Sequence, residues 1–158
     1  MVRAMTKLWS LVLTLVLTAS FALAATGCGS TDEKNSYVDQ VNAIQTKLQS
    51  DATAEISGGA PTSGAQAAQF AKKLQGLFAQ AADDLEAVTP PSDVADLHAQ
   101  LVAKVREIGD QIGKAADAFN SGNPQQIQQA ATELQTAISG AQGDLSSLID
   151  QINSTLQG

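Results

Sequence analysis

Two side chains in this sequence are of types that commonly do chemistry, and each type occurs only once. Cys28 is the single cysteine and His98 is the single histidine. A cysteine thiolate can be alkylated or can act as a nucleophile. An imidazole can transfer protons or bind a metal ion. Since neither residue has a second copy of its own kind, each must be interpreted from its neighbours in the chain.

His98 has few partners for metal binding or acid–base catalysis. Asp96 and Gln100 are two positions away and face other sides of a helix, and Asp93 is five positions away. The Glu-x-x-His pair that builds di-iron bundles does not occur. We therefore expect a structural role for His98 beside the core, where it bonds the preceding turn or packs on two nearby prolines.

The acidic cluster Asp83, Asp84 and Glu86 is the other candidate site, near the end of a predicted helix. A solvated face is the simplest interpretation. Weak calcium binding is the alternative, but calcium needs oxygen ligands turned inward by an irregular backbone, and nothing here resembles such a loop. The sequence also lacks a GxSxG motif and a glycine-rich phosphate loop. We expect no catalytic residues, no metal, no cofactor and no enzymatic activity.

Cys28 follows a segment with the features of a secretory signal. Arg3 and Lys7 make the start basic, residues 8–25 carry no charge, and small residues precede the cysteine. The positive-inside bias keeps the basic start in the cytosol, so the rest is exported. An uncleaved membrane helix is the alternative, because the uncharged segment is just long enough to span a bilayer. A disulfide has no partner cysteine.

The residues Ala25, Thr26, Gly27 and Cys28 resemble the lipobox of bacterial lipoproteins, although leucine is more usual at the position of Ala25. The resemblance implies a diacylglycerol on the Cys28 sulfur, cleavage before Cys28, and often acylation of the new amino group. Each buried methylene contributes about 0.8 kcal/mol, so two or three acyl chains hold firmly. We expect a signal peptide at residues 1–27 and a lipid anchor at the cell membrane, on the extracytoplasmic side.

Length and charge restrict what the exported part can be. Cleavage before Cys28 leaves a chain of one domain's length. The whole chain has 9 Lys and Arg against 16 Asp and Glu, a net charge of −7, and the loss of Arg3 and Lys7 makes the product more acidic. Such a surface repels phosphate, so we expect no nucleic-acid partner and membrane contact only through the lipid on Cys28.

Hydrophobic residues at spacings of three and four predict four helices, and no stretch alternates like a strand. Each apolar face is too narrow for a helix buried on all sides and too apolar for one that stands alone in water. The four faces are Tyr37, Val41, Ile44, Leu48, Ala52 and Ile56; Phe70, Leu74, Leu77, Phe78, Ala81, Leu85 and Val88; Val94, Leu97, Leu101, Val105, Ile108, Ile112, Ala116 and Phe119; and Ile127, Ala130, Leu134, Ile138, Ala141, Leu145, Leu148, Ile152 and Leu156.

Short breaks separate the four segments. Residues 57–64 are rich in Gly, Pro and Ser, and a Pro-Pro pair stops the second segment and can open the third. In the last break Gly122 can close one helix, Asn123 can cap the next and Pro124 fits its first position. Capping-box spacings, Ser30 with Glu33 and Ser63 with Gln66, mark the first two starts.

This pattern predicts an all-α fold, an antiparallel up-down-up-down four-helix bundle that follows the cleaved signal peptide. We assign residues 28–36 to a lipidated tether and residues 37–158 to the bundle domain. Gly109 and Gly113 interrupt the third helix, and Gly140 and Gly143 the fourth. The simplest interpretation is surface glycine; the alternatives are a close approach of the third and fourth helices, a bend or a groove.

The stretch TPPSDVADLHAQL is similar to a segment of small actinobacterial lipoproteins of unknown function, through Pro90, Pro91, Leu97, His98 and Leu101. This resemblance brings no activity with it. We expect a non-catalytic interaction or structural module of the cell envelope, whose unknown partner protein meets helix faces rich in Gln, Ala and Ser. The alternative is a solute- or lipid-binding protein that holds a small apolar ligand inside the bundle.

Overall fold

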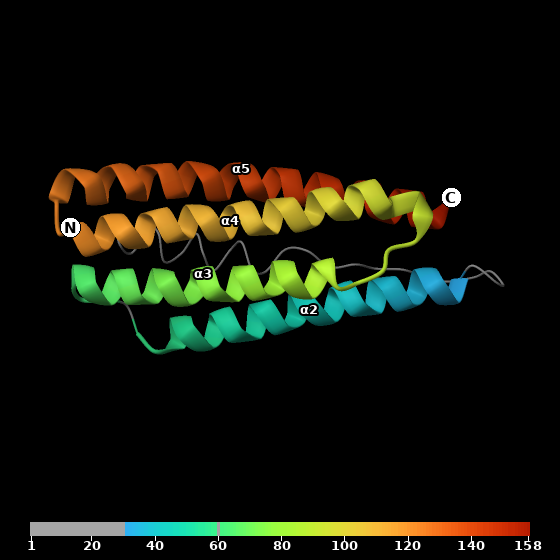
Figure 1. Cartoon of the computed structure of the whole chain (residues 1–158), viewed down its shortest axis with the longest axis horizontal. Helices are drawn as coiled ribbons and strands as arrows, with labels where there is room; N and C mark the ends of the chain where they lie inside the picture. The colour runs from blue at the N-terminus through green and yellow to red at the C-terminus, as the bar shows by residue number, and fades with distance from the viewer. Residues whose placement is uncertain (1–30, 60) are drawn as a thin grey trace.

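The computed structural model describes residues 31–59 and 61–158, which form four long α-helices and one 3-10 turn. The helices are α2 (Thr31–Ser57), α3 (Gly64–Glu86), α4 (Ala95–Ser121) and α5 (Pro124–Gln157), and the turn η1 (Ser92–Val94) precedes α4. Figure 1 shows successive helices running in opposite directions, with α3 and α4 between α2 and α5. No strand occurs within the two described ranges. The predicted all-α antiparallel four-helix bundle is confirmed.

The starts of α2 and α3 agree with the sequence signals in part. The α2 helix begins at Thr31, so it includes much of the segment 28–36 that we expected as a tether. Ser30 lies outside the described residues. At α3 the side chain of Ser63 accepts a hydrogen bond from the backbone of Gln66 at 3.2 Å. The Gln66 side chain, however, bonds Thr62 rather than Ser63, so the predicted capping box is only half formed.

The turn between α4 and α5 forms as its residues predict. Gly122 has φ 67° and ends α4 in the left-handed conformation that glycine adopts without strain. Asn123 caps α5 by accepting from the backbone N–H of Gln125 at 3.0 Å, and Pro124 occupies the first helical position. The Pro-Pro pair differs from expectation, because the short turn η1 separates it from α4.

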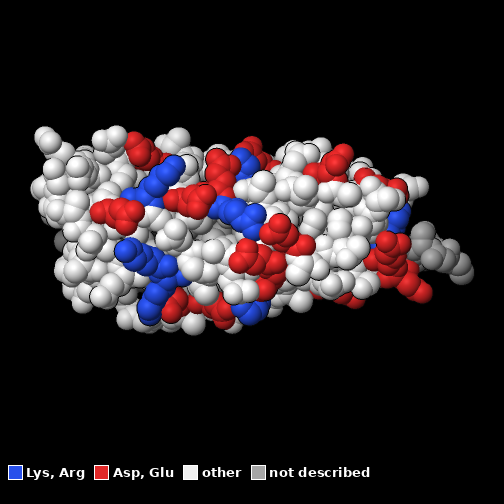
Figure 2. Space-filling model, viewed as in Figure 1, with Lys and Arg blue, Asp and Glu red and all other residues white. Residues whose placement is uncertain are grey.

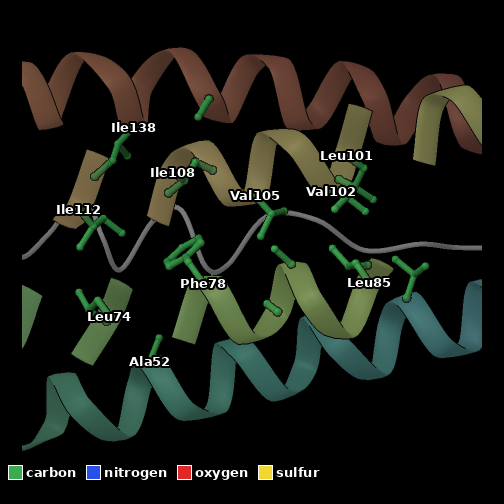
Figure 3. Packing of buried hydrophobic residues seen from close by; sticks show 14 of the residues in the cluster. Ala52, Leu74, Phe78, Leu85, Leu101, Val102, Val105, Ile108, Ile112 and Ile138 are labelled. Atoms are coloured by element: carbon green, nitrogen blue, oxygen red, sulfur yellow. The ribbon is translucent and has the colours of Figure 1, made fainter. Parts of the chain in front are cut away.

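The core is built around α4, which is buried on two sides because it lies between α3 and α5. In Figure 3 the ring of Phe78 on α3 points toward α4, between Val105 and Ile112. The α2 helix is buried near both of its ends, through Tyr37 and Ile56. The buried apolar side chains of α4 are Leu101, Val102, Val105, Ile108, Ile112, Ala115, Ala116 and Phe119.

Two glycines let α3 and α4 approach closely. A Cβ atom on Gly109 would lie 3.3 Å from the Cβ of Phe78, and one on Gly113 would lie 2.7 Å from the Cδ of Gln75. Both glycines are buried, so the interpretation of surface glycine is wrong for this pair. We expected any close approach to lie between the third and fourth predicted helices, which are α4 and α5. The structure instead shows it between α3 and α4. It is the exposed Gly140 that has open space where a Cβ would be.

These environments predict opposite effects of the same substitution. Gly109→Ala adds a methyl group against the Cβ of Phe78, which the backbone of α3 holds in place, and overpacking typically costs about 1–3 kcal/mol. Gly140→Ala meets nothing and gains about 1 kcal/mol of helix propensity. We expect urea unfolding to show G109A less stable and G140A more stable than the parent chain. Equal gains in both variants would contradict the close packing of α3 on α4.

Candidate functional site

His98 lies near the start of α4 and is only 5% exposed. Its Nε2 atom is 3.0 Å from the carbonyl oxygen of Leu85 on α3, and its Nδ1 atom is 3.1 Å from the hydroxyl of Tyr37 on α2. Since a carbonyl can only accept, Nε2 carries the proton, and Nδ1 accepts from the tyrosine hydroxyl. One imidazole therefore joins three helices.

Burial keeps both members of this pair neutral. It lowers the pKa of His98 below its ordinary value, and the bond to the carbonyl of Leu85 opposes that shift in part. Burial also raises the pKa of Tyr37 to about 12. The two rings meet edge to face, with centroids 5.6 Å apart and planes at 71°. At pH 7 the imidazole thus has one donor and one acceptor, and both are used.

The position of Leu85 explains why its carbonyl takes this bond. The last carbonyls of a helix have no intrahelical N–H partner. The oxygen of Leu85 accepts from the backbone N–H of Val88 at 2.9 Å and from His98 as well. We expected His98 to bond its own preceding turn or to pack on the prolines, but its partners come from two other helices. The sequence held one indication of this bond. Tyr37 lies on the apolar face of the first predicted helix, and a buried phenol hydroxyl needs a hydrogen-bond partner.

The acidic cluster at the end of α3 is paired with a cation rather than free. Arg106 donates to Asp83 at 3.0 Å and to Glu86 at 2.9 Å, and these bonds raise the pKa of its guanidinium. Asp84 accepts from the amide of Gln80 at 2.7 Å. Within residues 31–59 and 61–158, no group of three His, Cys, Asp or Glu side chains could hold a metal ion. The cluster therefore serves as an exposed link between α3 and α4.

Further ion pairs cross the other helix–helix contacts. Lys73 of α3 meets Glu55 of α2 at 2.8 Å, and Lys104 of α4 meets Asp144 of α5 at 3.0 Å. Bonds to Glu107 and Asp144 raise the pKa of Lys104. In Figure 2 the Lys and Arg side chains on the visible face lie next to Asp and Glu. Exposed pairs of this kind contribute little stability each, but they help to fix how the helices are rotated against each other.

A shallow groove runs along the seam between α4 and α5. Three adjoining hollows, of about 190, 210 and 450 Å³, share residues and run along much of both helices. We call this surface the α4–α5 groove. Its floor is apolar and includes Ala115, Ala130, Leu134, Ile138 and Ala141. Its rim is polar and partly charged, and includes Gln100, Lys104, Glu107, Gln111, Lys114, Gln129, Glu133, Asp144 and Ser147.

The α5 side of this groove has an unusual composition. The helix contains no Lys or Arg, and its charged residues are Glu133, Asp144 and Asp150. The rest of its exposed surface is mostly Gln, Ser and Thr. This is the helix face that the sequence suggested for a partner. The groove itself could not be predicted, because one of its two walls comes from α4.

The predicted lipidation residue, Cys28, and the signal segment lie outside the described residues. Among the helices that the structure does describe, none combines the length and the apolarity that a bilayer crossing requires.

A family of unknown function, DUF6376, matches residues 31–155. The chain belongs to this family. The DUF6376 match covers nearly all of the four helices, including His98, both of its partners and the α4–α5 groove. No curated protein and no solved structure matches the chain. Membership in DUF6376 therefore describes the helical bundle and adds no activity to it.

The contacts of His98 predict a large loss of stability when the ring is removed. In His98→Ala the Tyr37 hydroxyl loses its buried acceptor, at about 1–3 kcal/mol, and the missing ring leaves a cavity. We expect a total loss of about 3 kcal/mol in urea unfolding, and about 1–2 kcal/mol for Tyr37→Phe, which keeps the aromatic ring. The double variant should lose less than the sum, since both changes remove one hydrogen bond. Strict additivity would contradict the bond.

Proposed function

We propose that this chain is a lipid-anchored lipoprotein of the cell envelope that acts as a non-catalytic interaction module. The observation that carries the proposal is the α4–α5 groove, an open surface with a small-residue floor and an amide-rich rim. The anchor is supported by the basic start, the uncharged segment and the ATGC sequence that ends at Cys28. The partner we expect is another envelope protein.

The groove has the chemistry of a protein-binding surface. Alanine at Ala115, Ala130 and Ala141 keeps the floor low, so another backbone can come close. Leu134 and Ile138 belong to the same floor but are only 6% and 1% exposed. Glutamine side chains on the rim can both donate and accept hydrogen bonds. A partner helix or extended segment could therefore lie along the seam and satisfy its polar groups at the rim.

The contacts of the reactive side chains support a non-catalytic role. Both ring nitrogens of His98 are engaged in structural hydrogen bonds, and the ring is buried. Two carboxylates of the acidic cluster pair with Arg106. A general base needs a free nitrogen or carboxylate within reach of a substrate, and these groups are committed to holding helices together.

The alternative role, an apolar ligand held inside the bundle, has less support. It rests on a cavity left by alanine-rich seams between helices and by Gly109 and Gly113. The space at these two glycines is filled by Phe78 and by the side chain of Gln75. Native mass spectrometry of the full chain distinguishes the two roles, because a co-purifying small molecule would favour ligand binding.

The anchor predicts a defined covalent product. Intact-protein mass spectrometry of the chain from a bacterial membrane should show loss of residues 1–27 and addition of acyl groups at the new N-terminal cysteine. Cys28→Ser should remain unprocessed, because a hydroxyl is not alkylated as a thiolate is. An unmodified Cys28 with the leader still attached would overturn the envelope assignment.

The groove predicts where a partner is captured. A photo-crosslinking amino acid at Gln129 or Ser147, on the groove rim, should give one discrete crosslinked product in intact cells. The same group at Thr46 or Thr53, exposed on α2, serves as the matched control and should not give that product. The product should also disappear in the unprocessed Cys28→Ser chain. Equal capture from α2 and from the rim would refute a specific role for the groove.

A further inference from the structure

Two hydrogen bonds fasten the first turns of α2 to the rest of the bundle. The Tyr37 hydroxyl donates to Nδ1 of His98, and Lys34 Nζ donates to the carbonyl oxygen of Leu156 at 3.0 Å. Tyr37, Val38 and Val41 supply the buried apolar contacts of this segment. Of the two bonds, the one to His98 depends on a nitrogen that can take up a proton.

We propose that Tyr37 and His98 form an acid-sensitive latch, in which protonation of the His98 Nδ1 atom removes the acceptor of the Tyr37 hydroxyl and releases the first turns of α2. The reaction is a simple proton uptake from water. The neutral imidazole becomes an imidazolium with an N–H at both nitrogens, and no other covalent bond changes.

The closed site has no good place for that imidazolium. Its Nε2–H can keep the bond to Leu85, and the Tyr37 oxygen can accept from the new Nδ1–H. The tyrosine's own proton then loses its acceptor, and a positive charge is buried at a residue that is 5% exposed. Opening the segment hydrates both groups.

Among the described residues, no carboxylate forms a hydrogen bond or an ion pair with the ring. The ring's two hydrogen bonds go to a phenol and a carbonyl, and the ionisable residues on the elements packed around it are exposed or half-buried. The ionisable residues on these elements that lie toward the same end of the bundle are Lys34 on α2, Asp84 and Glu86 on α3, Asp93 in η1, Asp96 on α4 and Asp150 on α5. The salt bridges of the described residues do not include His98.

Linkage gives the sign and the size of the effect. The pKa of His98 is lowered in the closed form, whereas an exposed histidine titrates near 6.5. The latch is therefore at full strength above pH 6.5 and weakens as the pH falls from there through the lowered pKa. In that window the open form binds up to one more proton, so the opening equilibrium rises up to tenfold per pH unit.

Release would change the reach of the chain just after residue 28. A helical residue spans 1.5 Å and an extended one about 3.3 Å, so unwinding residues 31–37 roughly doubles the length of that segment. Only this consequence, a longer tether in acid, rests on the proposed lipid anchor. The latch itself is a property of the bundle and can be tested whether or not Cys28 is modified.

The test follows hydrogen exchange of amides 34–41 in the untagged full chain in detergent micelles between pH 7.5 and 5. After correction for intrinsic exchange, we expect opening of this segment to rise up to tenfold per pH unit below 6.5, ahead of α3 and α4. His98→Gln should remove this rise, because an amide can donate to Leu85 but does not titrate. Lys34→Gln is the matched control, and it should raise opening at every pH without changing the slope.

A second measurement does not depend on any variant folding. His98 is the only histidine, so ¹⁵N-histidine labelling gives one imidazole signal pair. We expect the Nε2–H tautomer at pH 7.5 and a pKa below 6.5. The proposal is overturned by an Nδ1–H tautomer, by a pKa of 6.5 or above, by the same pH slope in His98→Gln, or by acid opening that is uniform over all four helices.

Discussion

The structure depends on how one imidazole, one phenol and one helix-end carbonyl are buried together. Each group alone would lose hydrogen bonds to water on burial, at a cost of about 1–3 kcal/mol. Arranged in series, the Tyr37 hydroxyl, the His98 ring and the Leu85 carbonyl satisfy one another. The arrangement works only for the neutral ring with its proton on Nε2. It therefore couples the placement of α2, α3 and α4 to a single protonation state, a constraint that apolar packing alone does not impose.

The helices could be predicted from sequence because their signals are local. Hydrophobic spacing gave the four faces, and the order Gly122, Asn123, Pro124 gave the sharp turn with its left-handed glycine and its cap. Such signals act within a few residues. The side chain of Gln66 shows their limit, since it bonds Thr62 rather than the adjacent Ser63. Competition between two adjacent donors is decided by atomic geometry that spacing does not encode.

The failures in prediction concern contacts between helices. Gly109 faces α3 rather than solvent, which only the rotation of α4 determines. The partners of His98 lie 61 and 13 positions away in the chain, on helices whose relative register was unknown. The candidate surface was predictable only in part. The absence of Lys and Arg from α5 is visible in the sequence, but the groove needs α4 as its second wall. Cys28 lies outside the described residues.

The distribution of charge restricts the interactions by which the α4–α5 groove could recognise a partner. Lys73, Lys104 and Arg106 are already paired with carboxylates across helix–helix contacts. A partner that competes for them gains little, because it must break an existing pair for each one it forms. Lys114 lines the groove and takes part in none of the salt bridges of the described residues. Recognition at the groove can then combine close packing on alanine, hydrogen bonds to rim amides and an ion pair to Lys114. Since most of those contacts are short-ranged and one involves charge, affinity should depend mainly on shape and moderately on ionic strength.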